Sequence, residues 1–336
     1  MSISTRSESV RRALIGFLWR QWVQIGVFGE PSQRADPWAI DPESLLLLTL
    51  RTGGRDPRLF EETLDWLRAN GTLMSLQRLR NLAETPDLRA IADGAVAWAG
   101  ARNPRLRGWN RTEQKDVPEL LQLSRTRVRE PDPVLLAHGV MWPQFEPSGN
   151  SYAPDVGTPA TLAFQLRLFF GLGSRAEVVR VMLTGLGAAT AHRIAEATGF
   201  AKRNVHETLT ALVEAGPVIA ERRRNELVYT LHTAGWFDVL DLTEPIPSFL
   251  DWVALLRVLV PTVIWLDELE VTETTDYLAA SHARDLIEHV ESDLRLLGIR
   301  APDPARHLGS SYLAAFDEIL ARITSLLRGE RPPSPS

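Results

Sequence analysis

Cysteine is absent from the 336 residues of this chain. Disulfide bonds and thiolate metal ligands are therefore excluded. Lysine is also scarce: it occurs only at positions 115 and 202, so 35 of the 37 basic residues are arginine. Because alanine and leucine are abundant as well, we interpret this bias as the coding of a GC-rich bacterial genome rather than as a sign of function.

Long hydrophobic runs are missing too. The longest, residues 258–266, contains Pro261 and is far shorter than the roughly 20 apolar residues that span a bilayer. The N-terminus has no uninterrupted apolar core with a cleavage site, so the sequence predicts no signal peptide. We therefore expect a cytoplasmic protein with no membrane partner.

Motifs that carry catalytic chemistry are not found. The Gly-Leu-Gly triplets at 171–173 and 185–187 lack the third glycine and the lysine of a nucleotide-binding loop. No nucleophile-elbow motif occurs. His282 and His289 are seven residues apart, too far to hold one ion alone. We interpret one acidic cluster as a solvated helix end rather than a cation site: Asp267, Glu268, Glu270 and Glu273. The sequence thus predicts no enzyme, no cofactor and no metal.

Charge is distributed unevenly around a formal net charge of −5. Residues 101–129 carry eight basic and three acidic groups, whereas residues 232–336 carry eight and 17. Residues 174–231 carry eight and six, a net charge of +2. An acidic chain has no overall attraction for nucleic acid, so any such contact must be local.

The pattern of elements predicts a mainly α fold with a helical N-terminal domain, a central winged helix-turn-helix and a C-terminal helical bundle. Residues 101–129, the basic end of the N-terminal helical segment, are interpreted as a solvated connector. The alternatives are that they bind an acidic partner or nucleic acid. The predicted segments are 1–129, helical with that basic end; 130–160, a Pro-rich linker or long ordered loop; 161–235, the winged helix; 245–328, the bundle; and 329–336, a disordered tail.

Two Asp-Pro pairs punctuate the N-terminal domain. Asp41 and Asp56 each precede a proline, the arrangement of an N-cap followed by the first helical residue. Residues 57–84 could form a second helix-turn-helix in which Arg78 and Arg80 are exposed. We favour a plain helical hairpin, because no β-wing follows.

The most informative stretch is 174–231, which contains three helical patterns and a basic hairpin. Ser174 and Glu177 have the spacing of a capping box, which predicts the start of the first helix. The second helix is expected at 190–198, and Gly199 follows at a turn that favours positive φ. The third helix begins near Ala201, and its predicted buried stripe is Val205, Leu209 and Leu212.

The opposite face of the third helix is expected to contact DNA. It presents Lys202, Arg203, His206, Glu207 and Thr210, with Asn204 at its margin, and all of these except Glu207 are expected DNA contacts. Arginine pairs with guanine and asparagine with adenine, so Arg203 and Asn204 are the predicted base readers. Lys202 is expected to meet phosphate, which positions the helix without reading sequence.

A β-hairpin wing is predicted after the third helix. Its strands are expected at 218–222 and 226–231, because Pro217 lacks an N–H and delays the first strand by one residue. The turn at 223–225 is basic. The residues expected to contact phosphates are Arg222, Arg223, Arg224 and Asn225.

The spacing of six residues resembles winged-helix bacterial regulators of the MarR and ArsR kind: Ala195, Gly199, Val205, Leu209, Leu212 and Gly216. The resemblance covers about 60 of the 336 residues. This chain departs from the family pattern at Ala201, where these regulators usually have a Ser or Thr cap. It implies a transcriptional regulator that binds specific double-stranded DNA. We expect a homodimer, because the apolar helices at 275–297 and 309–327 exceed what one small domain can cover.

A second hypothesis is an interaction protein. Antitoxins of nucleotidyltransferase toxin systems often join a winged helix to a larger partner-binding domain, and the predicted architecture is similar to theirs. Such a protein would neutralise a toxin and regulate its own operon. A nucleotidyltransferase-like toxin encoded next to this gene would favour that hypothesis over a regulator that responds to a small ligand.

Overall fold

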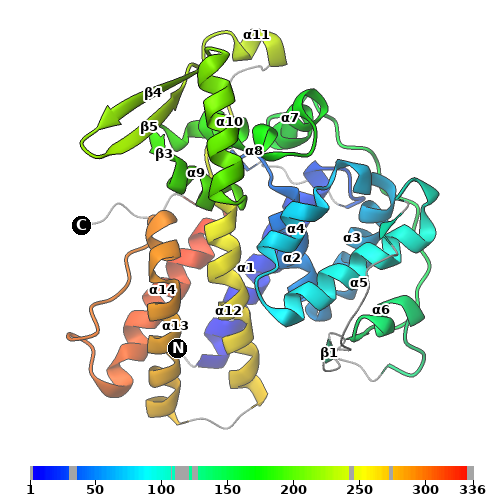
Figure 1. Ribbon diagram of the computed structural model, residues 1–336. Coiled ribbons are helices and arrows are strands. Elements are labelled where there is room, and N and C mark those ends of the chain that lie inside the picture. The colour runs from blue at the N-terminus through cyan, green and yellow to red at the C-terminus, as the bar shows by residue number, and fades with distance from the viewer. Residues whose placement is uncertain are drawn as a thin grey trace. The chain divides into compact units, whose positions relative to one another are not determined.

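The computed structural model describes residues 3–29, 36–106, 108–109, 121–122, 128–241, 246–271 and 275–330. Over these residues the fold is mainly α, as predicted, with 14 helices and a small three-stranded antiparallel sheet (Figure 1). Compactness groups the chain into a terminal unit, Met1–Trp19 with Ala254–Ser336, and a central unit, Arg20–Val253. The domain boundaries expected from the sequence stay a prediction.

The first part of the central unit is helical. Asp41 accepts a hydrogen bond from the Ser44 amide (3.1 Å), and Asp56 accepts one from the Leu59 amide (3.0 Å), so both predicted caps are confirmed. A buried Trp66 donates its indole N–H to the Ile25 carbonyl (2.7 Å). The helices are α1 (Ile3–Gln24), which crosses the unit boundary, α2 (Pro42–Thr52), α3 (Pro57–Asn70), α4 (Leu76–Leu82), α5 (Pro86–Arg102) and α6 (Pro133–Ala137).

Hydrogen bonds tie the Pro-rich stretch to the helices of the central unit. The Tyr152 amide donates to the Gly26 carbonyl (2.8 Å), and the Asn70 side chain donates to the Tyr152 carbonyl (3.0 Å). Strand β2 (Val140–Met141) pairs in parallel with β1 (Leu121–Gln122). Helix α6 was not predicted, although Asp132 caps it before a proline, as Asp41 caps α2.

Part of the basic stretch lies outside the described residues. These positions are Arg107, Arg111, Lys115, Arg125 and Arg127. Arg102 is described, and its guanidinium forms an ion pair with the buried Asp132 carboxylate (2.9 Å). This arginine therefore has a structural partner within the central unit.

The predicted helix-turn-helix and wing follow in the expected order. The strand order of the antiparallel sheet is β3-β5-β4, so the hairpin is joined to the segment before the second helix. Apolar residues of these elements form one core with the apolar helix that precedes them. The elements are α7 (Leu162–Phe170), α8 (Ser174–Val181), β3 (Ala189–Thr190), α9 (Ala191–Thr198), α10 (Lys202–Glu214), β4 (Val218–Arg223), β5 (Glu226–Leu231) and α11 (Trp236–Leu240).

The predicted capping box at the start of α8 is wrong. Gly173 is the N-cap, and no side chain caps this helix. The Ser174 hydroxyl instead shares a hydrogen bond with Thr208 of α10 (2.8 Å). Glu177 is buried and its carboxylate is bound by Arg167 (2.7 Å) and Arg180 (2.8 Å), so it cannot turn back to the start of its own helix.

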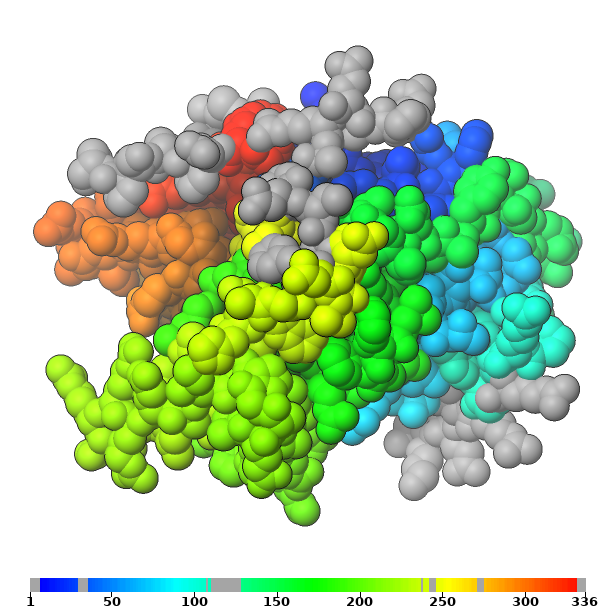
Figure 2. All heavy atoms as spheres, turned by 90° about the horizontal axis from the view of Figure 1, so that it is seen from above, coloured from blue at the N-terminus to red at the C-terminus, as the bar shows by residue number. Residues whose placement is uncertain are grey.

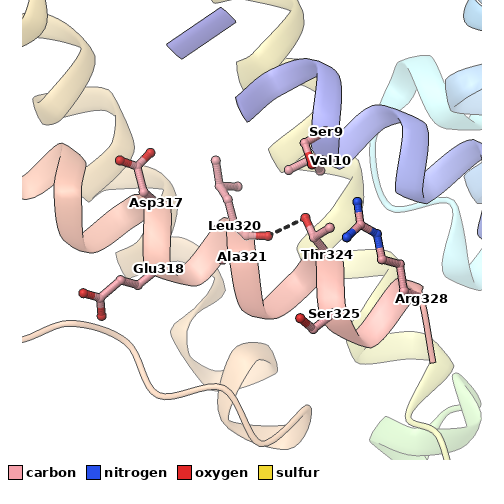
Figure 3. Close-up of a pocket in the computed structure, with 9 residues that line it drawn as sticks. All are labelled: Ser9, Val10, Asp317, Glu318, Leu320, Ala321, Thr324, Ser325 and Arg328. Carbon is pink, nitrogen blue, oxygen red and sulfur yellow. Dashed lines mark hydrogen bonds between the residues drawn. The ribbon is translucent and has the colours of Figure 1, made fainter. Parts of the chain in front are cut away.

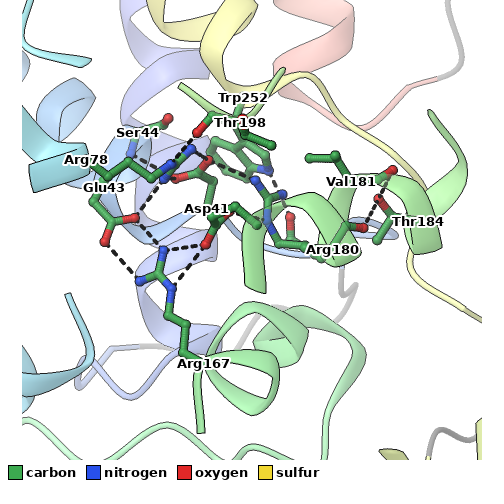
Figure 4. A network of polar contacts seen from close by, with 12 residues as sticks. Asp41, Glu43, Ser44, Arg78, Arg167, Arg180, Val181, Thr184, Thr198 and Trp252 are labelled. Atoms are coloured by element: carbon green, nitrogen blue, oxygen red, sulfur yellow. Dashed lines mark hydrogen bonds and ion pairs between the residues drawn. The ribbon is translucent and has the colours of Figure 1, made fainter. Parts of the chain in front are cut away.

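Glu177 belongs to a closed ring of six buried charges that links α2, α4, α7 and α8. Figure 4 labels the other five members. Neighbouring members are joined by hydrogen bonds of 2.6 to 3.1 Å. Each of the six side chains is at most 2 % exposed. Positive and negative members alternate, so the ring has no net formal charge. In order, its members are Arg78, Asp41, Arg180, Glu177, Arg167 and Glu43.

Arg78 also connects the ring to the helix-turn-helix. Its Nε donates to the carbonyl of Thr198, the last residue of α9, at 2.6 Å. Arg78 is therefore buried, whereas a second helix-turn-helix at residues 57–84 would leave it exposed. Arg80, two residues further along α4, is exposed.

The ring keeps its carboxylates ionised. Burial raises the pKa of Asp41, but Arg78 and Arg180 outweigh burial and hold this pKa below its ordinary value of 3.8. Burial likewise raises the pKa of Glu177, and Arg180 and Arg167 lower it by more, so that it lies below its ordinary value of 4.5. Protonating either carboxylate in the folded chain is therefore unfavourable.

Acid is expected to destabilise the fold through these two groups. Their pKa values are lower in the folded chain than in the unfolded chain, so their contribution is complete above pH 4.5 and is lost as pH falls towards the folded values. Urea unfolding at a series of pH values should show the unfolding free energy falling below pH 4.5. A Glu177→Gln variant should have a shallower acid slope, and an unchanged slope would contradict the assignment.

The terminal unit is an all-helical bundle over its described residues. Helix α12 (Trp252–Val271) begins in the central unit and continues through Pro261. The residues around Pro261 are buried and apolar, including Val258 and Val263. Their packing offsets the cost of about 3 kcal/mol of an interior proline. The other helices are α13 (Asp276–Leu296) and α14 (Tyr312–Leu327).

Two features of the terminal unit bear on the sequence interpretation. Asp267 and Glu270 form ion pairs with the buried Arg11 of α1, so these acids are not simply solvated. Glu273 lies outside the described residues. A groove of about 480 Å³ runs between α1 and α14, and Val10 and Leu320 contribute to its mostly apolar lining (Figure 3). No helix in the described part of the chain combines the length and the apolarity needed to cross a bilayer.

Candidate nucleic-acid interface

Helix α10 has one buried face and one exposed face. Val205, Leu209 and Leu212 are buried, so the predicted stripe is confirmed, and Thr208 is buried beside them. The helix is 13 residues long, about 20 Å at 1.5 Å per residue. Because its inner face packs on α8 and α9, the outer face points away from the core.

The predicted reading residues occupy this outer face. Lys202, Arg203, His206 and Thr210 are exposed, and Asn204 is half-buried at the margin. The Arg203 side chain is 86 % exposed and pairs with Glu207 one turn later (2.9 Å). An exposed pair of this kind contributes about 0–1 kcal/mol, so a base edge can displace Glu207 at little cost.

The turn before α10 is fixed by α4. Gly199 has φ +68°, the left-handed conformation predicted for it. A Cβ atom at this position would lie 2.6 Å from Leu82 Cδ2. The Asn81 amide donates to the Gly199 carbonyl (3.4 Å), and Arg78 donates to Thr198. Sequence reasoning missed these α4 contacts, since no local pattern identifies a partner 118 residues away.

The wing is a tight hairpin. Strand β4 begins at Val218 directly after Pro217, as predicted, but it extends to Arg223, so placing Arg223 in the turn is wrong. Arg223 pairs in register with Glu226, which leaves only Arg224 and Asn225 in the turn. The cause is a left-handed residue: Arg224 has φ +55°, which closes the hairpin in two residues.

The basic residues of the wing lie at its free end. Arg222, Arg223, Arg224 and Asn225 are all exposed. Figure 2 shows the yellow-green atoms of the hairpin projecting from the surface. Arg222 pairs in register with Leu227 on the strand face that also carries Ala220 and Tyr229, whereas Arg223 lies on the other face. Cations are therefore present on both faces of the wing, and that of Arg223 forms an exposed ion pair with Glu221 (3.3 Å).

A patch of exposed apolar side chains flanks the winged segment. Leu168 and Phe169 at the end of α7 are 64 % and 55 % exposed, and Val239 of α11 is 62 % exposed. The two helices are adjacent, because Gln165 of α7 donates to the Leu240 carbonyl of α11. The apolar patch consists of Leu168, Phe169, Leu172 and Val239.

Within the described part of the chain, no group of three or more histidine, aspartate or glutamate side chains is placed to hold a metal ion. Comparison of the chain with known protein families, with curated proteins and with solved structures found no match. The resemblance to winged-helix regulators therefore depends on the residues described above.

Proposed function

We propose that this protein is a transcriptional regulator that binds specific duplex DNA through α10 and the β4–β5 wing. One observation carries the proposal: the polar face of α10 and the basic tip of the wing are both exposed, while the opposite sides of these elements form a shared core. A major groove about 12 Å wide admits one helix. A wing beside that helix can contact the adjacent backbone phosphates.

Arg203 is assigned the role of a base reader, and Lys202 that of a phosphate contact. Both are exposed at the first turn of α10, the part of a recognition helix that reaches furthest into the groove. Arg203 presents a planar guanidinium that matches two acceptors on guanine. Ala201 provides no side-chain cap, so the first backbone N–H groups of α10 lack that partner and can also donate to phosphate.

Arg203→Ala is expected to relax sequence specificity. The variant should lose about 1–3 kcal/mol on its cognate duplex and little on duplexes altered at the base pair that Arg203 contacts. Fluorescence anisotropy with DNA from upstream of the gene, and with single-base-pair variants of it, measures both effects. Arg295→Ala is the matched control, because Arg295 forms the same kind of exposed helix pair, with Glu291 (2.9 Å). An equal loss on every duplex would contradict the assignment.

We also propose that the protein binds DNA as a homodimer. The proposed dimer interface is not the surface of the helices at 275–297 and 309–327 that the sequence led us to expect. The apolar residues of α13 and α14 are buried within the terminal unit, as Leu286, Val290 and Phe316 illustrate. The apolar patch is the exposed alternative. Arg175 lies at the start of α8, shortly after α7, and Asp238 lies on α11; both side chains are exposed. An isologous two-fold contact would pair such opposite charges around an apolar centre.

Phe169→Glu is expected to convert a dimer into a monomer. The charge would lie at the centre of the apolar contact, where its burial is unfavourable. Sedimentation velocity should give twice the chain mass of 37.5 kDa for the unmodified protein and the single mass for the variant. Leu308→Glu is the control, because Leu308 is 75 % exposed and lies outside the patch. A monomeric unmodified protein would disprove the dimer.

A further inference from the structure

A second pocket of the terminal unit has a different chemical character from the groove of Figure 3. It has a volume of about 390 Å³ and lies between α14 and the connection that precedes it. Three of the eight basic residues in 232–336 line this pocket, although that stretch carries 17 acidic residues. The charged and titratable lining residues are Arg300, Asp303, Arg306, His307, Glu318 and Arg322.

Two of these arginines are available to a ligand. Arg306 already pairs with Asp303 (3.3 Å), and Asp303 also accepts the Ala305 amide (3.0 Å). Among the described residues, neither Arg300 nor Arg322 has an ion pair or a side-chain hydrogen bond. Arg322 is half-buried. Two unpaired guanidinium groups that line one concavity repel each other, and an anion between them removes this repulsion.

The connection that forms one wall of the pocket is anchored. The Arg284 guanidinium donates to the His307 carbonyl (2.8 Å) and lies over the Tyr312 ring (4.9 Å from its centre). This fixes the backbone at His307, whose imidazole can donate a hydrogen bond to an anion. A wall held in place before binding reduces the entropy lost when a ligand is bound.

We propose that this pocket binds a small phosphorylated ligand that also carries hydroxyl groups, as a sugar phosphate or a mononucleotide does. The planar forks of Arg300 and Arg322 match the oxygens of a phosphate group. The Glu318 carboxylate lines the same pocket and accepts hydrogen bonds, which suits ligand hydroxyl groups. A volume near 390 Å³ lies within the usual range of small-molecule sites.

Isothermal titration of the full chain with ribose 5-phosphate tests the proposal. We expect one saturable site, and no binding of ribose at the same concentrations. Arg322→Ala should weaken binding at least about tenfold, since charge-assisted hydrogen bonds are lost. Arg322→Lys should also weaken it, because lysine presents a point charge instead of a fork. Arg295→Ala, which removes an exposed arginine of α13 outside the pocket, should bind like the unmodified chain.

Three results would overturn the proposal: no saturable binding of ribose 5-phosphate in the millimolar range, equal binding of ribose, or unchanged binding by Arg322→Ala. Thermal unfolding followed by circular dichroism verifies that each variant is folded, so a loss of binding is not a loss of structure. The outcome does not depend on DNA binding, because the titration contains no nucleic acid.

Discussion

Arg78→Met is expected to lower the free energy of unfolding by about 3–5 kcal/mol. The arginine donates to Asp41 (2.6 Å) and Glu43 (2.7 Å) inside the ring of buried charges, and to the Thr198 carbonyl at the helix-turn-helix. Methionine fills similar space but carries no donor. The two carboxylates would then be buried with one fewer positive partner, and the ring would have a net negative charge.

Urea unfolding of the full chain, with linear extrapolation to water, measures the effect. Arg80→Met is the matched control, because Arg80 lies on the same helix and is 54 % exposed beside Asp93 (3.5 Å). A surface change of this kind costs roughly 0.5 kcal/mol or less. If the two variants lose equal stability, the ring does not have the importance assigned to it.

Replacing the three wing arginines with alanine is expected to weaken binding to every duplex alike. These residues are Arg222, Arg223 and Arg224. Each phosphate contact adds about 0.9 to the slope of log affinity against log salt, so the slope should fall by about 2.7. At 0.1 M salt the same relation gives a loss of roughly several hundredfold. The preference among duplexes should remain, because it is assigned to α10 and not to the wing.

Anisotropy titrations between 50 and 200 mM salt, roughly the range over which such slopes are resolved, measure this change. A single-step comparison is Arg224→Gly, which removes one cation and also relieves the left-handed backbone at φ +55°. Its slope should fall by about 0.9. An unchanged slope in the triple variant would show that these arginines are only solvated.

Local signals in the sequence predicted much of the fold. The Asp-Pro pairs at Asp41 and Asp56 cap helices as expected. The apolar spacing of α10 gave its buried stripe, and Gly199 adopts the left-handed turn. These features are determined within a few residues along the chain, through hydrogen bonds to neighbouring amides and through helical periodicity.

The long-range contacts could not be predicted in the same way. Glu177 matched a capping box, but its partners Arg167 and Arg180 are provided by packing. One local signal does point to the buried charges. Residues 45–48 are four consecutive leucines, and a helix that is apolar all round is buried. The acids at its start, Asp41 and Glu43, therefore had to be buried with partners, and arginine supplies nearly all cations in this chain.

Selection of bound duplexes from a random library by the full chain tests the central claim most directly. If the outer face of α10 reads DNA, one sequence should be enriched, and Arg203→Ala should lose the enrichment at a single base-pair position while keeping the rest. The result that would contradict the account is recovery of duplexes with no preferred sequence, or an enriched sequence that Arg203→Ala leaves unchanged at every position.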